Sequence, residues 1–246
     1  KCTSVNLRDE RIRSVSITNK DGLKTELDAD LFIDATGRSR VLSKLVQKNL
    51  GEKRKPAKIK HVGFKAHFGN VNLEKGVCEI YFFRGGYGGL SHIENGDANH
   101  CFLIDSKVAR EFKGDADEIL RNVIFKNQRA HETLKDARKK FNWLGVSVEK
   151  FGKQQENETR NLLSIGDAAA FIDPFTGSGM LMALESSELL ANTIISEADR
   201  PEKDAFALLK MKFEKTHGLA TRKRLRACSL IHRLSFSPRL AGAVIA

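Results

Sequence analysis

The chain opens with short stretches in which apolar and polar residues alternate. Residues 14–18 (SVSIT) and 23–27 (LKTEL) flank an Asn-Lys-Asp-Gly turn, which predicts two strands joined by a hairpin. Residues 31–33 (LFI) are all apolar, which is typical of a strand buried on both faces. Residues 39–49 place apolar side chains at 41, 42, 45 and 46, the spacing of a helix face.

Residues 53–56 (KRKP) form a basic, proline-ended break, after which the pattern changes to a series of strand-like runs. We expect the chain to cross into a second domain there. Beyond it, glycine- and asparagine-rich turns separate several strand-like runs, which predicts an antiparallel sheet. These runs are residues 59–68, 77–83, 90–94 and 100–105. Residues 115–139 are expected to be helical.

The last third of the chain returns to strand and helix in alternation. We expect strands at 143–151 and 162–165, a helix at about 179–196, and a long basic helix or helix pair at 202–233 interrupted near His217-Gly218. The fold class is therefore α/β, or α+β overall, with one sheet domain interrupted by an antiparallel one and then completed. The expected segments are residues 1–55, 56–142 and 143–200, followed by a basic helical region at 201–246.

The composition is that of a globular protein, with 41% hydrophobic and 30% charged residues and no apolar run of membrane-spanning length. The net charge is +11, and much of the excess lies in residues 210–233. Charge alone would suit a solvated helix face, a nucleic-acid-binding module or peripheral membrane contact through the basic C-terminal helix. Because aromatic residues are only 7% and no nucleic-acid-binding motif is found, we expect no nucleic-acid partner. We expect a cytoplasmic protein, with membrane association through that helix as the alternative.

Four cysteines lie far apart, at positions 2, 78, 101 and 228. No CxxC or Cys/His ligand spacing occurs, so we expect no metal site and reduced, mostly buried thiols.

The stretch 162–191 (LLSIGDAAAFIDPFTGSGMLMALESSELLA) holds the first chemical motif. A buried strand ends at Gly166-Asp167, which places a carboxylate at the carboxyl edge of a sheet. Gly177 and Gly179 then allow a flat or anionic group to approach a helix N-terminus, whose N–H groups would stabilise negative charge. Thr176 or Ser178 is a candidate cap for that helix. The alternative is an ordinary strand-loop-helix. A nicotinamide fingerprint fails on its spacing and on its third glycine.

The stretch 29–40 (ADLFIDATGRSR) holds the second motif. A buried strand ends in Asp-Ala-Thr-Gly before a helix, and Gly37 would let a phosphate approach the backbone near Arg38 and Arg40. Alone, this motif is equally an ordinary strand-to-helix turn.

Together, two such motifs about 130 residues apart resemble the FAD-dependent superfamily of p-hydroxybenzoate hydroxylase-like monooxygenases, flavin-dependent halogenases and geranylgeranyl reductases. The resemblance covers most of residues 1–200. It implies an incomplete FAD/NAD(P)-binding Rossmann-like domain interrupted by an antiparallel-sheet substrate domain. It further implies FAD as cofactor, with NADPH or NADH as electron donor.

The resemblance also implies roles for individual residues. The DATG-type turn would lie near the dinucleotide, Asp167 would contact the ribityl chain, and the helix start at Gly179 would face the N1–C2=O edge of the flavin. The candidate cofactor-binding residues are Thr36, Gly37, Gly166, Asp167, Pro174, Gly177, Ser178, Gly179 and Met180.

Three departures from the family pattern qualify the resemblance. No GxGxxG unit is present and the chain does not begin with Met, so we expect a fragment whose main pyrophosphate site lies upstream and which is inactive alone. Leu181 stands where hydroxylases commonly have Asn. The segment 172–177 is closer to the reductase and halogenase branches, yet the tryptophan motif of tryptophan halogenases is missing.

A third stretch, residues 81–96 (YFFRGGYGGLSHIENG), gathers aromatic residues beside four glycines. It is either a substrate-domain strand or a hairpin with core aromatics. His92 and His100 are candidate acid/base groups, although isolated histidines are more often structural. We assign no catalytic residue, and we expect an FAD-dependent, monooxygenase-like oxidoreductase acting on a small or hydrophobic organic substrate, with a reductase of unsaturated lipid or a halogenase as the alternative.

Overall fold

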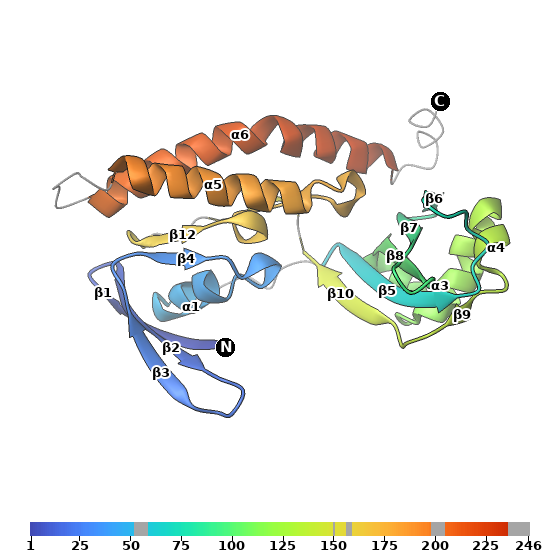
Figure 1. Ribbon diagram of the computed structural model, residues 1–246, viewed down its shortest axis with the longest axis horizontal. Coiled ribbons are helices and arrows are strands. Elements are labelled where there is room, and N and C mark those ends of the chain that lie inside the picture. The colour runs from blue at the N-terminus through green and yellow to red at the C-terminus, as the bar shows by residue number, and fades with distance from the viewer. Residues whose placement is uncertain (52–58, 150, 156–158, 198–204, 236–246) are drawn as a thin grey trace. The chain divides into compact units, whose positions relative to one another are not determined.

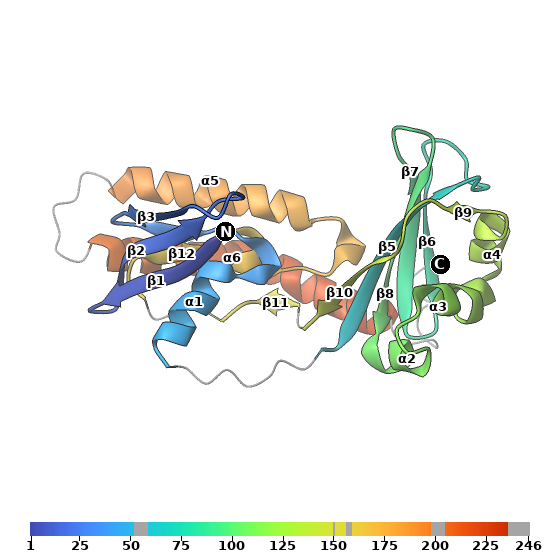
Figure 2. The same ribbon diagram turned by 90° about the horizontal axis from the view of Figure 1, so that it is seen from below.

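The computed structural model describes residues 1–51, 59–149, 151–155, 159–197 and 205–235 (Figures 1 and 2). The basic break expected at residues 53–56 lies outside the described residues. The chain divides into two units: unit 1 combines Lys1–Lys55 with Phe151–Ser229, and unit 2 combines Pro56–Lys150 with Leu230–Ala246. Unit 1 is thus built from two segments that are distant in sequence.

The N-terminal part of unit 1 is an antiparallel meander of β1 (Cys2–Arg8), β2 (Arg11–Thr18) and β3 (Lys24–Asp28). Its inward side chains, including Val5, Ile12 and Val15, pack with Val46 of α1 (Val41–Asn49). The hairpin predicted from the alternation in residues 14–18 and 23–27 is confirmed, because β2 and β3 pair antiparallel with Val15 opposite Leu27.

A two-stranded parallel sheet forms the centre of unit 1. In it β4 (Phe32–Asp34) pairs with β12 (Leu162–Ser164), and Figure 1 shows α1 on one side of the pair and α5 on the other. Buried Asn161 ties this pair to the meander. Its Oδ1 accepts from the Ile12 N–H at 2.9 Å, and its Nδ2 donates to the carbonyls of Ile12 and Asp30 at 2.8 and 3.0 Å.

Unit 1 also contains several short elements and two long helices. The short elements are η1 (Gly37–Ser39) in the first segment, and β11 (Gly152–Lys153), η3 (Gly166–Ala168), β13 (Ala170–Phe171) and η4 (Pro174–Thr176) in the second. Helix α5 (Gly179–Glu197) begins at the residue expected from sequence, and α6 (Ala205–Ser235) lies along it (Figures 1 and 2). Leu209 and Phe213 of α6 pack with Leu190 of α5 and Leu163 of β12.

The predicted interruption of α6 near His217-Gly218 is wrong, because the helix runs through both residues. Glycine weakens a helix by about 1 kcal/mol relative to alanine. Here buried His217 and Thr221 lie on the packed side, and the His217 ring stacks on Phe213 with centroids 5.4 Å apart. Tertiary packing of this side therefore outweighs the local preference of Gly218.

Unit 2 is a six-stranded antiparallel sheet with short helices. The strand order is β10-β5-β8-β7-β6, and β9 pairs with β5. The strands are β5 (His61–Gly69), β6 (Cys78–Phe83), β7 (Gly86–His92), β8 (Ala98–Asp105), β9 (Arg138–Lys139) and β10 (Leu144–Val148). The helical elements are α2 (Ser106–Glu111), α3 (Ala116–Asn122), η2 (Ile124–Lys126) and α4 (Gln128–Leu134). Side chains from these helices, including Ile119 and Leu134, share a core with Phe64, Phe68 and Phe102 of the sheet.

Three sequence expectations need correction. Residues 144–148 do not belong with the segment that follows them, because β10 pairs with β5 from Leu144↔Lys65 to Val148↔His61 and is therefore part of the sheet of unit 2. The described part of residues 201–246 is not a separate region, since α6 contributes Leu209 and Phe213 to the core of unit 1. Residues 115–139 are not one helix, because Asn127 caps a new helix through its side chain and the segment ends in β9.

The strand at 31–33 was expected to be buried on both faces. In the described part of the chain Phe32 is buried but Ile33 is 44% exposed, so the expectation that both faces are buried is wrong. No helix in the described part of the chain combines the length and the apolarity needed to cross a bilayer.

Candidate functional site

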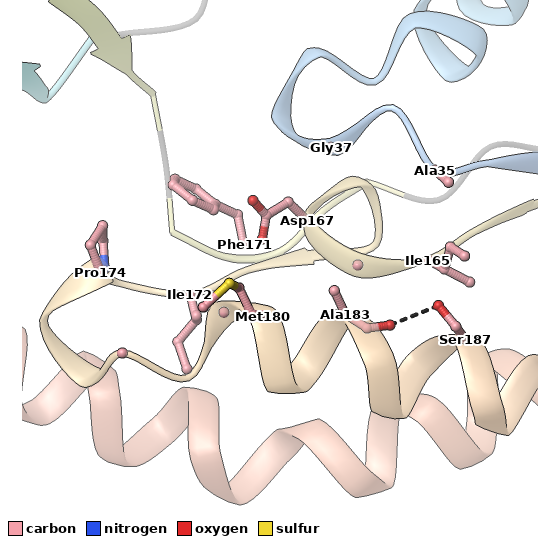
Figure 3. Close-up of a pocket in the computed structure, with 13 residues that line it drawn as sticks. Ala35, Gly37, Ile165, Asp167, Phe171, Ile172, Pro174, Met180, Ala183 and Ser187 are labelled. Atoms are coloured by element: carbon pink, nitrogen blue, oxygen red, sulfur yellow. Dashed lines mark hydrogen bonds between the residues drawn. The ribbon is translucent and has the colours of Figure 1, made fainter. Parts of the chain in front are cut away.

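A pocket of about 470 Å³ opens at the carboxyl ends of the parallel strands β4 and β12 (Figure 3). Both strands end at the same edge because they run parallel, so residues that follow them meet there although about 130 positions separate them. The lining residues are Ala35, Gly37, Ile165, Gly166, Asp167, Phe171, Ile172, Pro174, Gly177, Gly179, Met180, Ala183 and Ser187.

The first wall is the turn after β4, and buried Asp34 holds it in shape. Its Oδ1 accepts from the Thr36 N–H at 3.1 Å and the Thr36 hydroxyl at 2.5 Å. Its Oδ2 accepts from the N–H and the hydroxyl of Ser43 at 2.9 and 2.7 Å. One carboxylate thus fixes both the turn and the start of α1, and it carries Gly37, with φ +62°, to the pocket edge.

The second wall is the turn after β12. This turn packs against α5 and is hydrogen-bonded to it. The Gly166 N–H donates to the Ser186 hydroxyl at 2.9 Å, and that hydroxyl donates to the Ala183 carbonyl at 2.8 Å. Gly166 has φ +57°, and a Cβ there would lie 3.2 Å from the Cβ of Ala183. The turn therefore requires glycine, both for its left-handed backbone and for its close packing on Ala183. It places the half-buried Asp167 side chain at the pocket, between Phe171 and the Gly37 loop (Figure 3).

The third wall is the loop before α5 and the first turn of that helix. Buried Asp173 accepts from the Phe175 N–H at 3.0 Å, which stabilises the η4 turn, and Gly177 closes the turn at φ +62°. The first turn of α5 contains no acidic side chain. Its leading N–H groups have no acceptor within the helix, so this end of the pocket carries a partial positive charge.

The charged groups at the pocket are Asp167 and Arg38. Burial raises the pKa of the Asp167 carboxyl, and the Arg38 guanidinium partly opposes this shift. Arg38 also lies over the Phe171 ring, 5.3 Å from its centroid. A residue of the 29–40 motif, Arg38, therefore contacts the 162–191 motif beside the one carboxylate that lines the pocket.

Seven of the nine residues predicted from sequence line the pocket. They are Gly37, Gly166, Asp167, Pro174, Gly177, Gly179 and Met180. The other two make local bonds instead. The Thr36 hydroxyl bonds to Asp34 and accepts from the Val41 N–H at 2.7 Å, and the Ser178 hydroxyl donates to the Thr176 carbonyl at 3.1 Å. The Thr176 hydroxyl donates to the Asp173 carbonyl, so neither candidate cap bonds α5 through its side chain.

Sequence reasoning missed six lining residues: Ala35, Ile165, Phe171, Ile172, Ala183 and Ser187. Ala183 and Ser187 follow Gly179 at intervals of four, so the spacing of one helix face would have found them. Phe171 ends the short strand β13 and Ile172 follows it, and the sequence does not reveal the path of the backbone through η3 and β13.

The remaining candidates lie in unit 2 and have structural partners. A ring nitrogen of His92 bonds to the Leu73 carbonyl at 2.9 Å. Fully buried His100 bonds through Nδ1 to the Gly89 carbonyl at 3.0 Å, and burial lowers the pKa of its imidazole to about 4. Tyr81 is likewise buried, in the core of unit 2.

The cysteines are unpaired, but the expectation that most are buried is wrong, because Cys78 and Cys101 are exposed and only Cys228 is buried. Within the described ranges, no group of three or more His, Cys, Asp and Glu side chains is arranged to hold a metal ion.

No protein-family model matches the sequence, and no curated protein matches it. Solved structures do match. The flavin-dependent brominase Bmp2 superposes with a TM-score of 0.69 and 16% identity over 96% of this chain and 58% of the brominase. The myxobacterial chondrochloren halogenase CndH, described as an FAD-dependent halogenase, has a TM-score of 0.67 and 19% identity over 90% of this chain and 52% of its own.

A geranylgeranyl bacteriochlorophyll reductase-like protein from Thermoplasma acidophilum has a TM-score of 0.65 and 20% identity over 96% of this chain and 55% of its own. The chain therefore spans just over half the length of these three structures. Two of the branches named from the sequence motifs, the halogenases and the geranylgeranyl reductases, are among the structural neighbours, so the resemblance is confirmed at the level of fold.

Proposed function

We propose that this chain is part of an FAD-dependent oxidoreductase, and that the pocket of unit 1 holds the flavin end of the cofactor. The observation that carries the proposal is that both motifs, distant in sequence, line one pocket at the carboxyl ends of a parallel strand pair. This is where α/β folds bind ligands. The folds of flavin-dependent neighbours support the same proposal.

The residues present fit a flavin. The volume of about 470 Å³ lies within the range of small-molecule sites, roughly 300–1,000 Å³. A Cβ at Gly37 or Gly177 would meet no atom within 4 Å, so both backbones border open space into which a flat ring or a phosphate can come close. The lining is mostly apolar, and its polar features are the Asp167 carboxylate, the Ser187 hydroxyl and a helix N-terminus.

Each wall has a distinct role in this proposal. Asp167 accepts hydrogen bonds from the hydroxyls of the ribityl chain. The start of α5, at Gly179 and Met180, directs backbone N–H groups at the N1–C2=O edge of the ring, where the reduced flavin carries negative charge. Gly37 brings the backbone of the 29–40 motif close to the dinucleotide, and Thr36 and Ser178 act indirectly by shaping the two turns.

Bound FAD would supply the electron-transfer chemistry that protein side chains lack. The protein's own contribution is to bind and orient the cofactor and to stabilise charge at one edge of it.

We further propose that unit 1 is an incomplete Rossmann-like domain and that the sheet of unit 2 carries the substrate. The proposed electron donor is NADPH or NADH, and the proposed substrate is a small or hydrophobic organic molecule.

The test is FAD affinity of the natural full-length protein, measured by quenching of flavin fluorescence. Removing the Asp167 carboxylate with Asp167→Ala should weaken binding roughly 10- to 100-fold, the value of one or two charge-assisted hydrogen bonds. The matched control is Asp21→Ala, which removes an exposed carboxylate in the β2–β3 turn of the same unit. Protein that takes up no FAD, or equal affinity in both variants, would rule out the proposed site.

The dependence of the reaction on O₂ and on halide distinguishes three types of reaction. A monooxygenase would consume O₂ together with NADPH or NADH in the presence of substrate. A reductase of unsaturated substrates would oxidise the donor under anaerobic conditions, and a halogenase would require halide. Donor oxidation followed at 340 nm or so, with and without O₂ and halide, separates the three.

A further inference from the structure

One side of α6, which contributes no residue to the pocket lining, carries an unusual combination of side chains. Met211, Lys215, Leu219, Arg222 and Arg226 follow one another at intervals of four, four, three and four residues, which places them on one side of the helix. We call these five residues the outer face of α6. All five are exposed, and the two large apolar side chains, Met211 and Leu219, are both 61% exposed.

The opposite side of α6 accounts for its place in the fold. Phe213, His217, Thr221 and Cys228 are buried there, with Phe213 in the core beside Leu163 and Cys228 beside Met182 and Ala170. The outer face is therefore not needed to hold the helix in unit 1, and its apolar residues are not explained by the core.

The described Lys and Arg side chains of α6 fall into two groups. Three are bound to neighbours: Lys210 to the Thr159 carbonyl at 2.8 Å, Lys212 to Glu197 at 2.5 Å, and Arg224 to Glu185 at 2.6 Å. Lys215, Arg222, Lys223 and Arg226 form no hydrogen bond or ion pair within the described part of the chain. The single acidic residue of α6, Glu214, lies off the outer face, 3.8 Å from Lys210.

We propose that the outer face of α6 docks on the surface of an anionic lipid bilayer. The three cations of the outer face and the adjacent exposed Lys223 make a cluster of four Lys and Arg. Such a cluster on an amphipathic helix matches the negative surface potential of anionic lipids, and the interleaved apolar side chains enter the boundary between headgroups and acyl chains. Nucleic acid would use the charges but leaves Met211 and Leu219 unexplained, so the bilayer is the better match. This proposal does not depend on FAD binding.

The main test is cosedimentation of the natural full-length protein with vesicles of phosphatidylcholine alone or mixed with phosphatidylglycerol. Binding should require the anionic lipid and weaken as salt screens the charges. The triple variant Lys215→Glu/Arg222→Glu/Arg226→Glu should lose roughly a hundredfold in affinity, at about fivefold or more for each cation.

The matched control is Lys20→Glu/Lys24→Glu/Lys48→Glu, which makes the same change in net charge at exposed positions of unit 1 away from α6. It should keep most of the binding. A second variant, Met211→Ser/Leu219→Ser, leaves every charge in place and should weaken binding about tenfold, because it removes only the apolar contacts. Thermal unfolding of all variants confirms that they fold, since every substituted side chain is exposed.

Several results would overturn the proposal. They are equal losses in the triple variant and its control, equal binding to neutral and anionic vesicles, unchanged binding of Met211→Ser/Leu219→Ser, or binding to RNA of matched charge without binding to anionic vesicles. Because the vesicle experiment needs no flavin, its outcome is separate from that of the FAD titration.

Discussion

At the residue scale, Asp34 is the side chain on which the first wall of the pocket depends. It is fully buried, and four donors from Thr36 and Ser43 surround its two oxygens. Asp34→Asn would replace one oxygen by an NH₂ group that faces donors, so at least one N–H or O–H loses its acceptor. We predict a loss of about 2–4 kcal/mol in the free energy of unfolding, measured with urea at neutral pH.

The same substitution at an exposed carboxylate provides the comparison for Asp34. Asp21→Asn alters a turn in which Asp21 accepts from Asn19 at 3.3 Å, and it should change stability by less than about 0.5 kcal/mol. If Asp34→Asn were as mild as Asp21→Asn, the carboxylate would not be organising the turn.

Two glycines of the 162–191 motif, Gly166 and Gly179, should behave differently. Gly166 has φ +57° and no room for a Cβ, whereas Gly179 has an ordinary φ and a Cβ there would lie 3.7 Å from Ile172. Gly166→Ala should cost about 1–3 kcal/mol in stability. Gly179→Ala should leave the melting temperature nearly unchanged but place a methyl group at the pocket, which weakens FAD binding if the cofactor lies there.

Thermal melts and FAD titrations on both variants check this contrast. Equal stability of the two variants would show that the turn at Gly166 relaxes without strain.

Individual pocket residues could be predicted where chemistry and chain position coincide. Asp167 ends a buried strand, and Gly177 and Gly179 precede a helix, so their places followed from local rules. Thr36 and Ser178 could not be placed, because a hydroxyl in a turn bonds to the pocket or to its own backbone equally well by sequence, and here both bond locally.

At the element scale, α4 is held on the sheet of unit 2 by a partly buried cluster around Glu79 of β6. Glu79 accepts from Arg129 Nε at 2.7 Å, from the Thr133 hydroxyl at 3.0 Å and from the Tyr81 hydroxyl. Burial alone would raise the pKa of Glu79, but these hydrogen bonds outweigh burial and hold it below its ordinary value. Ionised Glu79 is therefore favoured in the folded protein.

The sign of the resulting pH dependence follows from that lowered pKa. The unfolded chain binds a proton near pH 4.5 and the folded protein only below that value, so the stabilisation is complete above about pH 4.5 and is lost as the pH falls through the folded pKa. Glu79→Gln should cost about 1–2 kcal/mol at pH 7, and the difference from the natural protein should shrink below pH 4.5.

Urea unfolding between pH 3 and 7 or so measures this change. Glu111→Gln, at an exposed ion pair with Arg84, is the control and should show little effect. A difference that stayed constant with pH would mean that the charge of Glu79 is unimportant for docking α4.

Helices and strands with strong periodicity were predictable, and those defined by distant partners were not. The start of α5 follows from its glycines and apolar pattern. The membership of β10 was missed because a strand's own alternation does not identify its partner, and only the register with β5 assigns it to unit 2. The continuity of α6 was missed because packing of Phe213 and His217 outweighs the local effect of Gly218.

At the scale of the whole molecule, the two units have separate hydrogen-bonded sheets and separate cores. The strands of unit 1 pair only with one another in the described ranges, and the same holds for the strands of unit 2. The large core around Phe64, Phe102 and Ile119 belongs to unit 2, and the cores around Leu162 and Leu163 belong to unit 1. The inserted sheet was predictable because a series of strand-like runs, separated by turns rich in Gly and Asn, interrupts the pattern of the flanking segments. Its second boundary was not predictable.

Separate cores imply that each unit can open without the other. Ile119→Ala and Leu162→Ala each create a cavity at a fully buried site, worth about 2–5 kcal/mol. Backbone amides exchange with solvent through local opening, so lost stability appears as faster exchange in the cooperative unit that was weakened. Ile119→Ala should therefore speed exchange in β5 and β8 while leaving β4 and β12 protected, and Leu162→Ala should do the reverse. Hydrogen–deuterium exchange followed by mass spectrometry resolves these strands, and faster exchange in both units from either substitution would mean that the whole chain opens as one cooperative unit.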